Sequence, residues 1–415
     1  MPNMNGPNLD GVSKNPIDRK IVFSNDSTMH LSAINQSFTI SAIHIMYGIP
    51  FTDGNRVTLL WKDKESFHNI YEIIRNAKEL ICLQFYIFRN DETGNELAEI
   101  LKQKASEGVK VYIIYDHFGS FLTPAKFWSG LTKAGVQIRA SYPFRWTRPF
   151  HYVHRDHKKL IIIDGKKVFT GGLNIANEYR GYHRLRKMKG WRDTGIFIEG
   201  PIAKTLLEIF KKSWEIWKGV PIRFDKRVDP ITRGIPVIPI FASSSRGRRQ
   251  MRKMLYYSIN RSQTCICLTT AYFTPSRRML QVLAEAVQRG VDVKLLLPGK
   301  TDVIAAHYAG RAFFAKLLME GVEIYNYQGE VLHAKTYVFD GIWNIIGSAN
   351  LDFQSLRKND EGNVGILDPN FGAQMIEVFY EDLKQSERIT LDKWLKRPFI
   401  EKVKESFFAL FRRRL

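Results

Sequence analysis

One pattern occurs twice in this chain, and the duplication constrains the fold more than any other feature of the sequence. Residues 154–177 read HRDHKKLIIIDGKKVFTGGLNIAN, and residues 333–350 read HAKTYVFDGIWNIIGSAN. The matched residues are separated by the same interval of 176 positions, from His157 to His333, from Lys159 to Lys335 and from Asp164 to Asp340. One match to so short a pattern can arise by chance, but two matches that share one interval are not a plausible accident. The sequence therefore predicts a duplicated domain.

The duplication extends to stretches before each pattern. AKELICLQFYIF (77–88) resembles RSQTCICLTTAYF (261–273), and EGVKVYIIYD (107–116) resembles RGVDVKLLLPG (289–299). In each half these apolar runs alternate with helix-like stretches, which is typical of strands covered by helices. We therefore predict an α/β fold of two tandem domains, each a mixed, mostly parallel sheet with flanking helices.

Composition places the boundaries between the parts. With 415 residues, of which 44% are hydrophobic, the chain can bury two cores. We expect the first domain at 55–230 and the second at 231–385, joined through a stretch rich in proline, arginine and aspartate. Residues 1–54 form an N-terminal segment whose start we expect to be disordered, because it is rich in asparagine, serine and glycine. Residues 386–415 form a basic amphipathic tail.

Two further features bear on the cellular compartment. The sequence has no apolar run of about 18 residues for a membrane span and no secretory signal at its start. Its three cysteines, Cys82, Cys265 and Cys267, lie in apolar runs, where core packing is the expected role. An odd number of buried cysteines favours a reducing compartment without disulfides. We therefore expect a cytoplasmic protein.

The paired histidines and lysines indicate phosphodiester chemistry. Alternation places His157 and Lys159 on one side of an extended strand. A histidine can act as a nucleophile or as a proton donor, so two facing copies could perform both roles in one reaction. The lysines supply positive charge for phosphate oxygens, and Asn174, Ser348 and Asn350 supply hydrogen-bond donors. We expect no metal or other cofactor, because the lysines provide the charge and the sequence has no convincing cluster of metal ligands. Polar strand ends without function are the alternative, which the second copy disfavours.

The duplicated H-x-K-x4-D pattern, followed by GG or GS and asparagine, resembles the phospholipase D superfamily over about residues 57–385. The resemblance implies two halves packed about a pseudo-twofold axis, with one active site at their interface. It also implies a covalent phosphohistidine on His157 and a proton-transferring role for His333. Four further residues would hold the phosphate: Lys159, Lys335, Asn174 and Asn350. Asp164 and Asp340 complete the catalytic motif, although their place at the far strand ends predicts a structural role.

The resemblance further implies an acid that orients each histidine. Asp193 in GWRDTGIFIEGP and Glu361 in KNDEGNVGIL stand at matching places before apolar runs. A carboxylate bonded to the distal imidazole nitrogen fixes the tautomer and stabilises the imidazolium. A surface salt bridge is the alternative for each acid, and the neighbouring Asp360 leaves the second assignment open by one position.

Several stretches are similar to the bacterial cardiolipin synthase branch of this superfamily: YIFRNDETG (86–94), FTGGLNIANEY (169–179), WRDTGIFIEGP (191–201), AYFTP (271–275) and SANLDFQSL (348–356). Synthases of this branch usually carry two N-terminal transmembrane helices, and the chain resembles a shorter form without them. The resemblance implies transfer of a phosphatidyl group onto the glycerol headgroup of phosphatidylglycerol. The aromatic and basic loop 141–152 is our candidate lining for the acceptor, and packing of this loop on its own domain is the alternative. Hydrolysis of phospholipids and metal-independent cleavage of nucleic acid remain the alternatives.

Charge indicates the partner. A net charge of +21 and a pI near 9.7 predict attraction to an anionic polymer or membrane. Basic clusters lie at 180–192 and 245–253 and in the tail. The tail carries an apolar stripe bordered by basic residues, and this pattern predicts either an interfacial helix or a helix packed on its domain. The stripe consists of Phe399, Ile400, Val403, Phe407, Leu410 and Phe411. We expect anionic phospholipids (phosphatidylglycerol and cardiolipin) and the membrane surface as partners, in preference to nucleic acid. The sequence does not predict the oligomeric state.

Overall fold

The computed structural model describes residues 38–412, except for 47, 145–146, 148–153 and 182–189. The disorder expected at the start of the chain concerns residues outside this described part. Residues 38–45 are helical and pack through Phe38 and Ala42 against the core of the second half. No helix in the described part is both long and apolar enough to cross a membrane.

The elements of the two halves follow one another in matching order. The first half contains β1 (Thr52–Leu60), α2 (Asp63–Arg75), β2 (Leu80–Phe85), α3 (Glu92–Ser106), β3 (Lys110–Asp116), α4 (Ala125–Lys133), β4 (Gln137–Ser141), β5 (Leu160–Ile163), β6 (Lys167–Gly171), α5 (Asn177–Arg180), β7 (Gly195–Glu199) and α6 (Ile202–Ile216). The second half contains β8 (Ile235–Ala242), α7 (Ser245–Arg261), β9 (Cys265–Thr269), α8 (Arg277–Gln288), β10 (Asp292–Pro298), α9 (Ile304–Arg311), α10 (Phe314–Met319), β11 (Glu323–Tyr327), β12 (Thr336–Phe339), β13 (Trp343–Gly347), α11 (Phe353–Arg357), β14 (Glu361–Leu367) and α12 (Pro369–Lys384). Three elements close the chain: β15 (Ser386–Ile389), α13 (Leu391–Leu395) and α14 (Phe399–Leu410).

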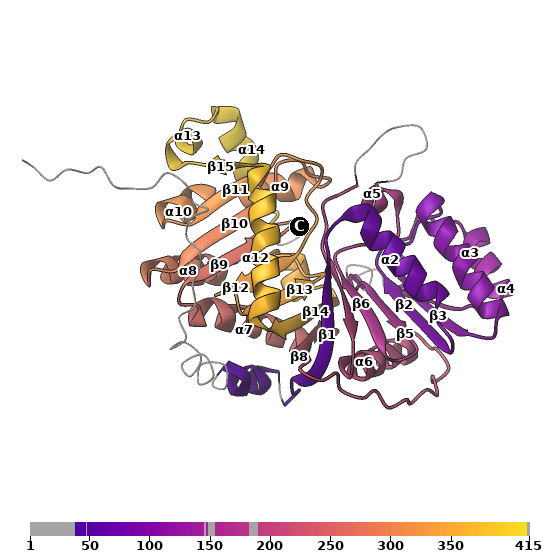
Figure 1. Ribbon diagram of the computed structural model, residues 1–415. Coiled ribbons are helices and arrows are strands. Elements are labelled where there is room, and N and C mark those ends of the chain that lie inside the picture. The colour runs from indigo at the N-terminus through magenta and orange to yellow at the C-terminus, as the bar shows by residue number, and fades with distance from the viewer. Residues whose placement is uncertain (1–37, 47, 145–146, 148–153, 182–189, 413–415) are drawn as a thin grey trace, which may run out of the picture.

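The strands of the described residues form one continuous sheet. Its order is β15-β11-β10-β9-β12-β13-β14-β8-β1-β7-β6-β5-β2-β3-β4. Read outward from the antiparallel pair of β1 and β8, both halves have the same strand order. The two halves therefore lie side by side about an approximate twofold axis, which confirms the predicted tandem α/β fold (Figure 1).

The sheet is mixed, as predicted, but parallel pairing does not dominate it. In the described residues, parallel pairs are confined to β2–β3–β4 and β9–β10–β11. The strands after each motif are antiparallel because they belong to hairpins. Asp164-Gly165 and Asp340-Gly341 form the hairpin turns, with positive φ at both positions (50° and 63°, 52° and 66°). Such a turn reverses the chain within a few residues and so returns the next strand antiparallel.

Buried side chains form a core on each face of the sheet. One cluster crosses the centre and joins both halves, with α6 and α12 supplying residues such as Trp214 and Phe371. The opposite face is covered separately, by α2 and α3 in the first half and by α7 and α8 in the second. Cys82 and Cys267 are buried in the shared cluster and Cys265 is half-buried, and all three are free thiols.

The segment after α12 extends the second half. β15 pairs antiparallel with β11 at the edge of the sheet, so the first residues of the expected tail belong to the sheet. α13 packs against the core of the second half through Trp394. The domain boundaries at 55, 230 and 385 stay predictions; the strands that open the two halves begin at Thr52 and Ile235.

Candidate active site between the two halves

The two motif histidines lie at the interface of the halves, each anchored by a backbone hydrogen bond to the other half. The amide of His157 donates to the carbonyl of Asp360 (2.8 Å), and the amide of His333 donates to the carbonyl of Arg192 (2.8 Å). These two contacts are related by the twofold arrangement of the halves. The fold therefore fixes both histidines in one buried place.

Each imidazole is paired with an acid from the opposite half. His157 Nδ1 lies 3.1 Å from Glu361 Oε2, and His333 Nδ1 lies 2.7 Å from Asp193 Oδ2. Both carboxylates are buried. Asp360, which the sequence left as an alternative to Glu361, instead faces Lys158, Arg248 and Tyr142. The acid in contact with His157 is therefore Glu361.

The hydrogen bonds define the tautomer of each histidine. His157 Nδ1 also lies 3.1 Å from the carbonyl oxygen of Ser348, which can only accept, so Nδ1 carries the proton. Burial raises the pKa of Asp193 to about 6, against the opposing charge of Lys335, so this carboxylate is ionised at neutral pH and accepts from His333 Nδ1. In both rings Nε2 therefore keeps its lone pair.

Burial favours the neutral form of both imidazoles. Burial lowers the pKa of His157, and the Lys159 ammonium adds to the effect. Burial and the ammonium groups of Lys335 and Lys159 hold the pKa of His333 well below its usual value. A neutral imidazole is a nucleophile. A phosphate group bound beside the rings would raise the pKa of either one by its negative charge and so allow it to act as an acid.

The two motif lysines bring buried positive charge to the same place. Lys159 and Lys335 are both buried, and each ammonium donates to the carbonyl of its own motif histidine, at 2.7 Å for Lys159. Burial lowers their pKa values to about 7 and about 8. An anion that binds beside a buried ammonium group stabilises its charged form. The lysine pair thus favours a phosphate-bearing ligand.

Ser348 and its counterpart in the first half serve the orienting acids. The Ser348 hydroxyl donates to Glu361 Oε2 (2.5 Å) and accepts from the amide of Gly362. Gly172 stands at the matching position, where an added Cβ would lie 2.0 Å from Asp193 Oδ1. A side chain there would displace the Asp193 carboxylate. The expected role of Ser348 in binding phosphate stays a prediction, since its hydroxyl is bonded to Glu361.

The two asparagines hold the loops that follow β2 and β9. Asn174 Oδ1 accepts from the amide of Ile87 (3.1 Å), and its Nδ2 donates to the hydroxyl of Tyr179 (2.8 Å). Asn350 Oδ1 accepts from the amide of Tyr272 (3.4 Å). The asparagines thus have equivalent structural contacts in the two halves, and direct phosphate binding by them stays a prediction.

Asp164 and Asp340 lie far from the histidines. Asp164 accepts hydrogen bonds from the amides of residues 78–80, and Asp340 from those of residues 263–265, with distances between 2.8 and 3.3 Å. These amides open β2 and β9, whereas His157 contacts Tyr86 beyond the other end of β2. A strand of this length separates the two places by roughly 20 Å. The assignment of Asp164 and Asp340 to the catalytic residues is therefore corrected. Both carboxylates fix strand ends and do not reach the histidines.

We expect Asp164→Ala to lower the free energy of unfolding by about 3 kcal/mol, because it leaves several backbone amides without their acceptor. Urea denaturation of the purified protein would measure the change. Asp229→Ala is the control, since that carboxylate is exposed in an ion pair with Arg227 and should contribute less than about 1 kcal/mol. A large loss of turnover at unchanged stability would instead place Asp164 in the chemistry.

Aromatic side chains around the histidines were not predicted as site residues. The ring of Tyr86 lies 4.9 Å from that of His157. Tyr179, Trp191 and Tyr272 surround His333 at 5.2, 5.5 and 6.4 Å between ring centroids. Tyr86 and Tyr272 follow the matched strands β2 and β9, and that correspondence in the repeat was the signal that could have identified them.

Two expectations concern residues outside the described part. Most of the aromatic and basic loop at 141–152 and most of the basic cluster at 180–192 lie there. Within the described residues, no group of three or more histidine, cysteine, aspartate or glutamate side chains is placed to hold a metal ion.

Residues 70–214 and 255–383 match the protein family described as cardiolipin synthase, PLD-like domain. The chain is 32% identical over 380 residues to the probable cardiolipin synthase YwiE of Bacillus subtilis, a match that covers 90% of this chain and 74% of that protein. It is also 32% identical over 368 residues to the major cardiolipin synthase ClsA of the same bacterium, with 87% and 75% covered.

The fold has a counterpart among solved structures. The crystal structure of phosphatidylserine synthase from Haemophilus influenzae Rd KW20 superposes with a TM-score of 0.69 and covers 91% of this chain and 100% of that one. The two sequences are 15% identical, so this likeness concerns the fold alone. The two segments of the family match fall one in each half of the sheet.

Proposed function

The chain belongs to the phospholipase D superfamily, in the family described as cardiolipin synthase, and we propose that it transfers a phosphatidyl group onto the glycerol headgroup of phosphatidylglycerol. The observation that carries this proposal is the crossed pair of histidines and acids beside two buried lysines. This arrangement supplies two imidazoles whose Nε2 atoms carry a lone pair, and the positive charge that a phosphodiester requires. The names of the relatives support lipid as the substrate class.

In the first step, His157 Nε2 attacks the phosphorus of the donor lipid. A bond forms between nitrogen and phosphorus, and the bond from phosphorus to the headgroup oxygen breaks. His333, protonated at Nε2 in the presence of the substrate, gives its proton to the departing alkoxide. The lysines neutralise the non-bridging oxygens, where negative charge accumulates in the transition state. The products are a free headgroup alcohol, which is glycerol if the donor is phosphatidylglycerol, and a phosphatidyl-histidine.

In the second step, His333 acts as the base. Its Nε2, now neutral, removes the proton from a glycerol hydroxyl of the acceptor lipid, and the resulting oxygen attacks phosphorus. The bond to His157 breaks, and cardiolipin leaves. Water in place of the acceptor would give phosphatidic acid, which is the hydrolase alternative. Glu361 and Asp193 hold the two rings in position through both steps.

One assay separates the candidate activities. The purified protein would be incubated with phosphatidylglycerol vesicles and, separately, with single-stranded DNA, and the products analysed by mass spectrometry. Cardiolipin and glycerol as the main products support the transferase. Phosphatidic acid without cardiolipin would establish a hydrolase, and cleaved DNA without lipid turnover would overturn the proposal in favour of a nuclease.

The tail helix supports adsorption to a membrane. In α14, Phe399, Phe407 and Leu410 expose 80%, 54% and 79% of their area, whereas Glu405 is buried. Ile400, Val403 and Phe411 are exposed on the same stripe. The helix thus turns its apolar stripe to the outside.

Ion pairs hold the opposite side of α14 to the protein. Glu405 is paired with Arg311 Nε (3.0 Å) on α9 and with Arg397 Nη2 (2.6 Å) before α14. Tyr308 on α9 stacks against Phe408 with ring centroids 5.9 Å apart. Because the polar contacts face inward, the exposed stripe is free to enter the headgroup region of a bilayer. Its basic neighbours and the net charge of +21 favour an anionic surface. Together with the free thiols, these features support a peripheral enzyme on the cytoplasmic face of the membrane.

We expect the double variant Phe399→Ser/Leu410→Ser to bind phosphatidylglycerol vesicles roughly 30-fold or more weakly. Burial of these two exposed side chains in the bilayer should contribute about 2 kcal/mol or more to the binding free energy. Turnover of a soluble short-chain lipid should stay unchanged. Vesicle sedimentation measures the binding. The control, Ile40→Ser/Ile216→Ser, removes two apolar side chains that are each 63% exposed elsewhere on the protein. Equal binding by variant and control would show that α14 does not contact the membrane.

A further inference from the structure

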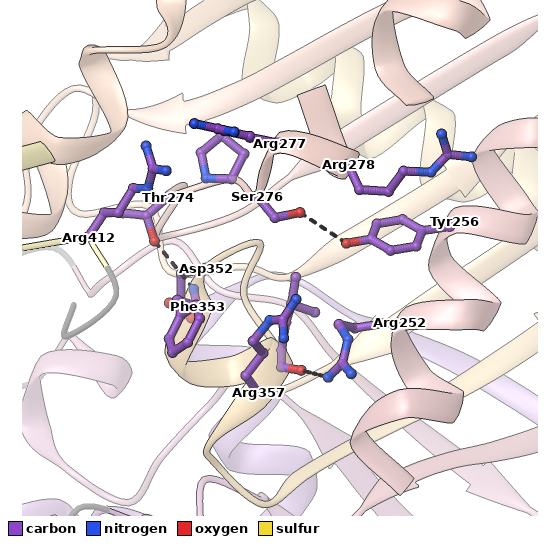
Figure 2. A pocket seen from close by; sticks show the side chains of 12 residues that line it. Arg252, Tyr256, Thr274, Ser276, Arg277, Arg278, Asp352, Phe353, Arg357 and Arg412 are labelled. Carbon is purple, nitrogen blue, oxygen red and sulfur yellow. Dashed lines mark hydrogen bonds between the residues drawn. The ribbon is translucent and has the colours of Figure 1, made fainter. Parts of the chain in front are cut away.

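A second positively charged site lies in the second half, apart from the two histidines. It is a cavity of about 720 Å³ between α7, α8, α11 and Arg412, which lies two residues beyond the end of α14. Five arginines from these elements line it: Arg252, Arg277, Arg278, Arg357 and Arg412. Figure 2 shows their side chains around the one hollow. Neither histidine, nor either orienting acid, lines this cavity.

The positive charge of the cavity is poorly balanced. Among the described residues, the one ion pair that these five arginines form is a long contact between Arg278 and Glu285, at 3.6 Å. Arg252 donates to the carbonyl of Leu356. Burial and the neighbouring guanidinium of Arg357 lower the pKa of Arg252, so the arginines oppose one another's charge. An anion in the cavity would relieve this repulsion.

Two of the arginines lie over aromatic rings. The guanidinium of Arg357 lies 5.6 Å from the ring centroid of Phe353, and that of Arg412 lies 5.3 Å from that of Phe313. Asp352 is the carboxylate on the cavity wall, but it caps α11 through the amide of Ser355, and burial raises its pKa to about 7. This single carboxyl group is only partly ionised at neutral pH, so it offsets at most one of the five arginine charges.

Neutral donors and a helix end add to the site. Ser276 caps the twelve-residue helix α8, and its hydroxyl lies 3.1 Å from the hydroxyl of Tyr256 (Figure 2). The amino end of α8 adds partial positive charge at the cavity wall. Guanidinium groups, hydroxyls and a helix amino end are the donors that phosphate oxygens prefer in proteins.

We propose that this cavity is a second phosphate-binding site, which takes either the headgroup of an anionic lipid or a soluble phosphate compound. The lipid source rests on the proposed function. It is supported by the position of Arg412, which follows the exposed Phe411 at the end of α14 and so joins the cavity to the apolar stripe. The loop after β9 links the cavity to the histidines, since Tyr272 contacts His333 and Thr274 lines the cavity. A lipid headgroup bound here would belong to the bilayer that supplies the active site.

Calorimetry with the full chain tests the site directly. The probes are inorganic phosphate and glycerophosphoglycerol, the headgroup of phosphatidylglycerol without its acyl chains, at constant ionic strength. We expect two binding sites per chain, one at the histidines and one in the cavity. Arg252→Gln/Arg357→Gln should leave one, with the other weakened about tenfold or more. A single site in the unaltered protein would overturn the proposal.

Matched variants separate a site from general charge. Arg249→Gln/Arg261→Gln removes two exposed arginines from α7, the same helix as Arg252, but neither lines the cavity. This control should keep both sites. A second pair, Arg277→Gln/Arg278→Gln on α8, should repeat the loss if the first pair folds poorly. Equal weakening by control and cavity variants would mean that the arginines act only through net charge, and the proposal fails.

Competition identifies the source of the phosphate. If a lipid headgroup is the ligand, the cavity variants should bind phosphatidylglycerol vesicles more weakly than the control. Glycerophosphoglycerol should then compete with the vesicles for the cavity at lower concentration than inorganic phosphate does. If a soluble phosphate is the ligand, phosphate should occupy the cavity and vesicle binding should match the control. Failure of the proposed function would appear differently, as absence of cardiolipin from phosphatidylglycerol with both phosphate sites still present.

Discussion

Replacing His157 or His333 with alanine is expected to reduce turnover by about 10⁴-fold, without unfolding the protein. Each imidazole performs a step that the other cannot take over, because one must bind phosphorus while the other moves the proton. Cardiolipin formed from phosphatidylglycerol vesicles measures turnover, and thermal denaturation measures folding. His68→Ala is the control, since His68 is an exposed residue of α2. A histidine variant that keeps a rate near that of the unaltered protein would remove that histidine from the mechanism.

The two histidine variants should differ with an activated substrate. A p-nitrophenyl phosphodiester releases an anion that needs no proton, so the first step does not require an acid. His333→Ala should then form the covalent intermediate, release one equivalent of nitrophenolate and stop, because no base remains for the second step. His157→Ala should release none. Acid-labile phosphorus on His157 identifies the nucleophile, whereas a burst in His157→Ala with phosphorus on His333 would reverse the two roles.

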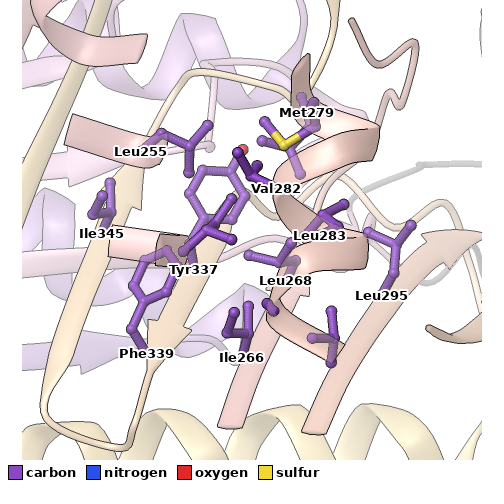
Figure 3. Close-up of a cluster of buried hydrophobic side chains, with 14 of the residues drawn as sticks. Leu255, Ile266, Leu268, Met279, Val282, Leu283, Leu295, Tyr337, Phe339 and Ile345 are labelled. Atoms are coloured by element: carbon purple, nitrogen blue, oxygen red, sulfur yellow. The ribbon is translucent and has the colours of Figure 1, made fainter. Parts of the chain in front are cut away.

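Much of the fold follows from local patterns in the sequence. In β9, Ile266 and Leu268 alternate with Cys267, which places the first two on one face and the cysteine on the other. Figure 3 shows Ile266 and Leu268 packed toward Met279 and Leu283 of α8. Cys267 lies in the cluster on the opposite face. The apolar runs, the helix-like stretches between them and the repeated motif were enough to predict the strands, the helices and the duplication.

These local patterns could not predict how the two halves join. A repeat indicates that two similar sheets form, but not which edges meet. The contact depends on the pairing of β1 with β8 and on isolated bridges such as Asp156 with Asp360 and Arg192 with Leu332. These bridges set each histidine beside the acid of the other half. The sequence predicted both acids, yet the exchange between halves depends on contacts that lie far apart along the chain.

The orientation of α14 also depends on a contact that no local pattern in the sequence predicts. The spacing of its apolar residues predicted a helix with an apolar stripe, but it left open whether that stripe faces the protein or the outside. The answer depends on Arg311 of α9, which pairs with Glu405 and turns the polar side inward. A charge pair between separate helices leaves no periodic signal in either one.

The exchange of acids between the halves leads to a second large effect. Asp193→Asn and Glu361→Gln should each reduce turnover by about 10²- to 10⁴-fold, because an amide can stabilise the wrong tautomer and does not stabilise the imidazolium. Both changes keep the shape of the side chain, so folding should be retained. Since burial raises the pKa of Asp193 to about 6, turnover should also fall as the pH drops below about 6 and this carboxylate gains a proton. Glu361→Asp and Asp193→Glu keep the carboxylate but change its position, so they test whether a displaced carboxylate restores turnover.

The activated substrate shows which histidine each acid serves. Asp193 contacts His333, so Asp193→Asn should behave like His333→Ala, with a burst of nitrophenolate and a slow second step. Glu361 contacts His157, so Glu361→Gln should slow the burst itself. Combining Asp193→Asn with His333→Ala should cost little more than His333→Ala alone, because the acid acts through the ring that has been removed. If the two acid variants showed the opposite pattern, each acid would serve the histidine of its own half, and the crossed contacts would not persist during turnover.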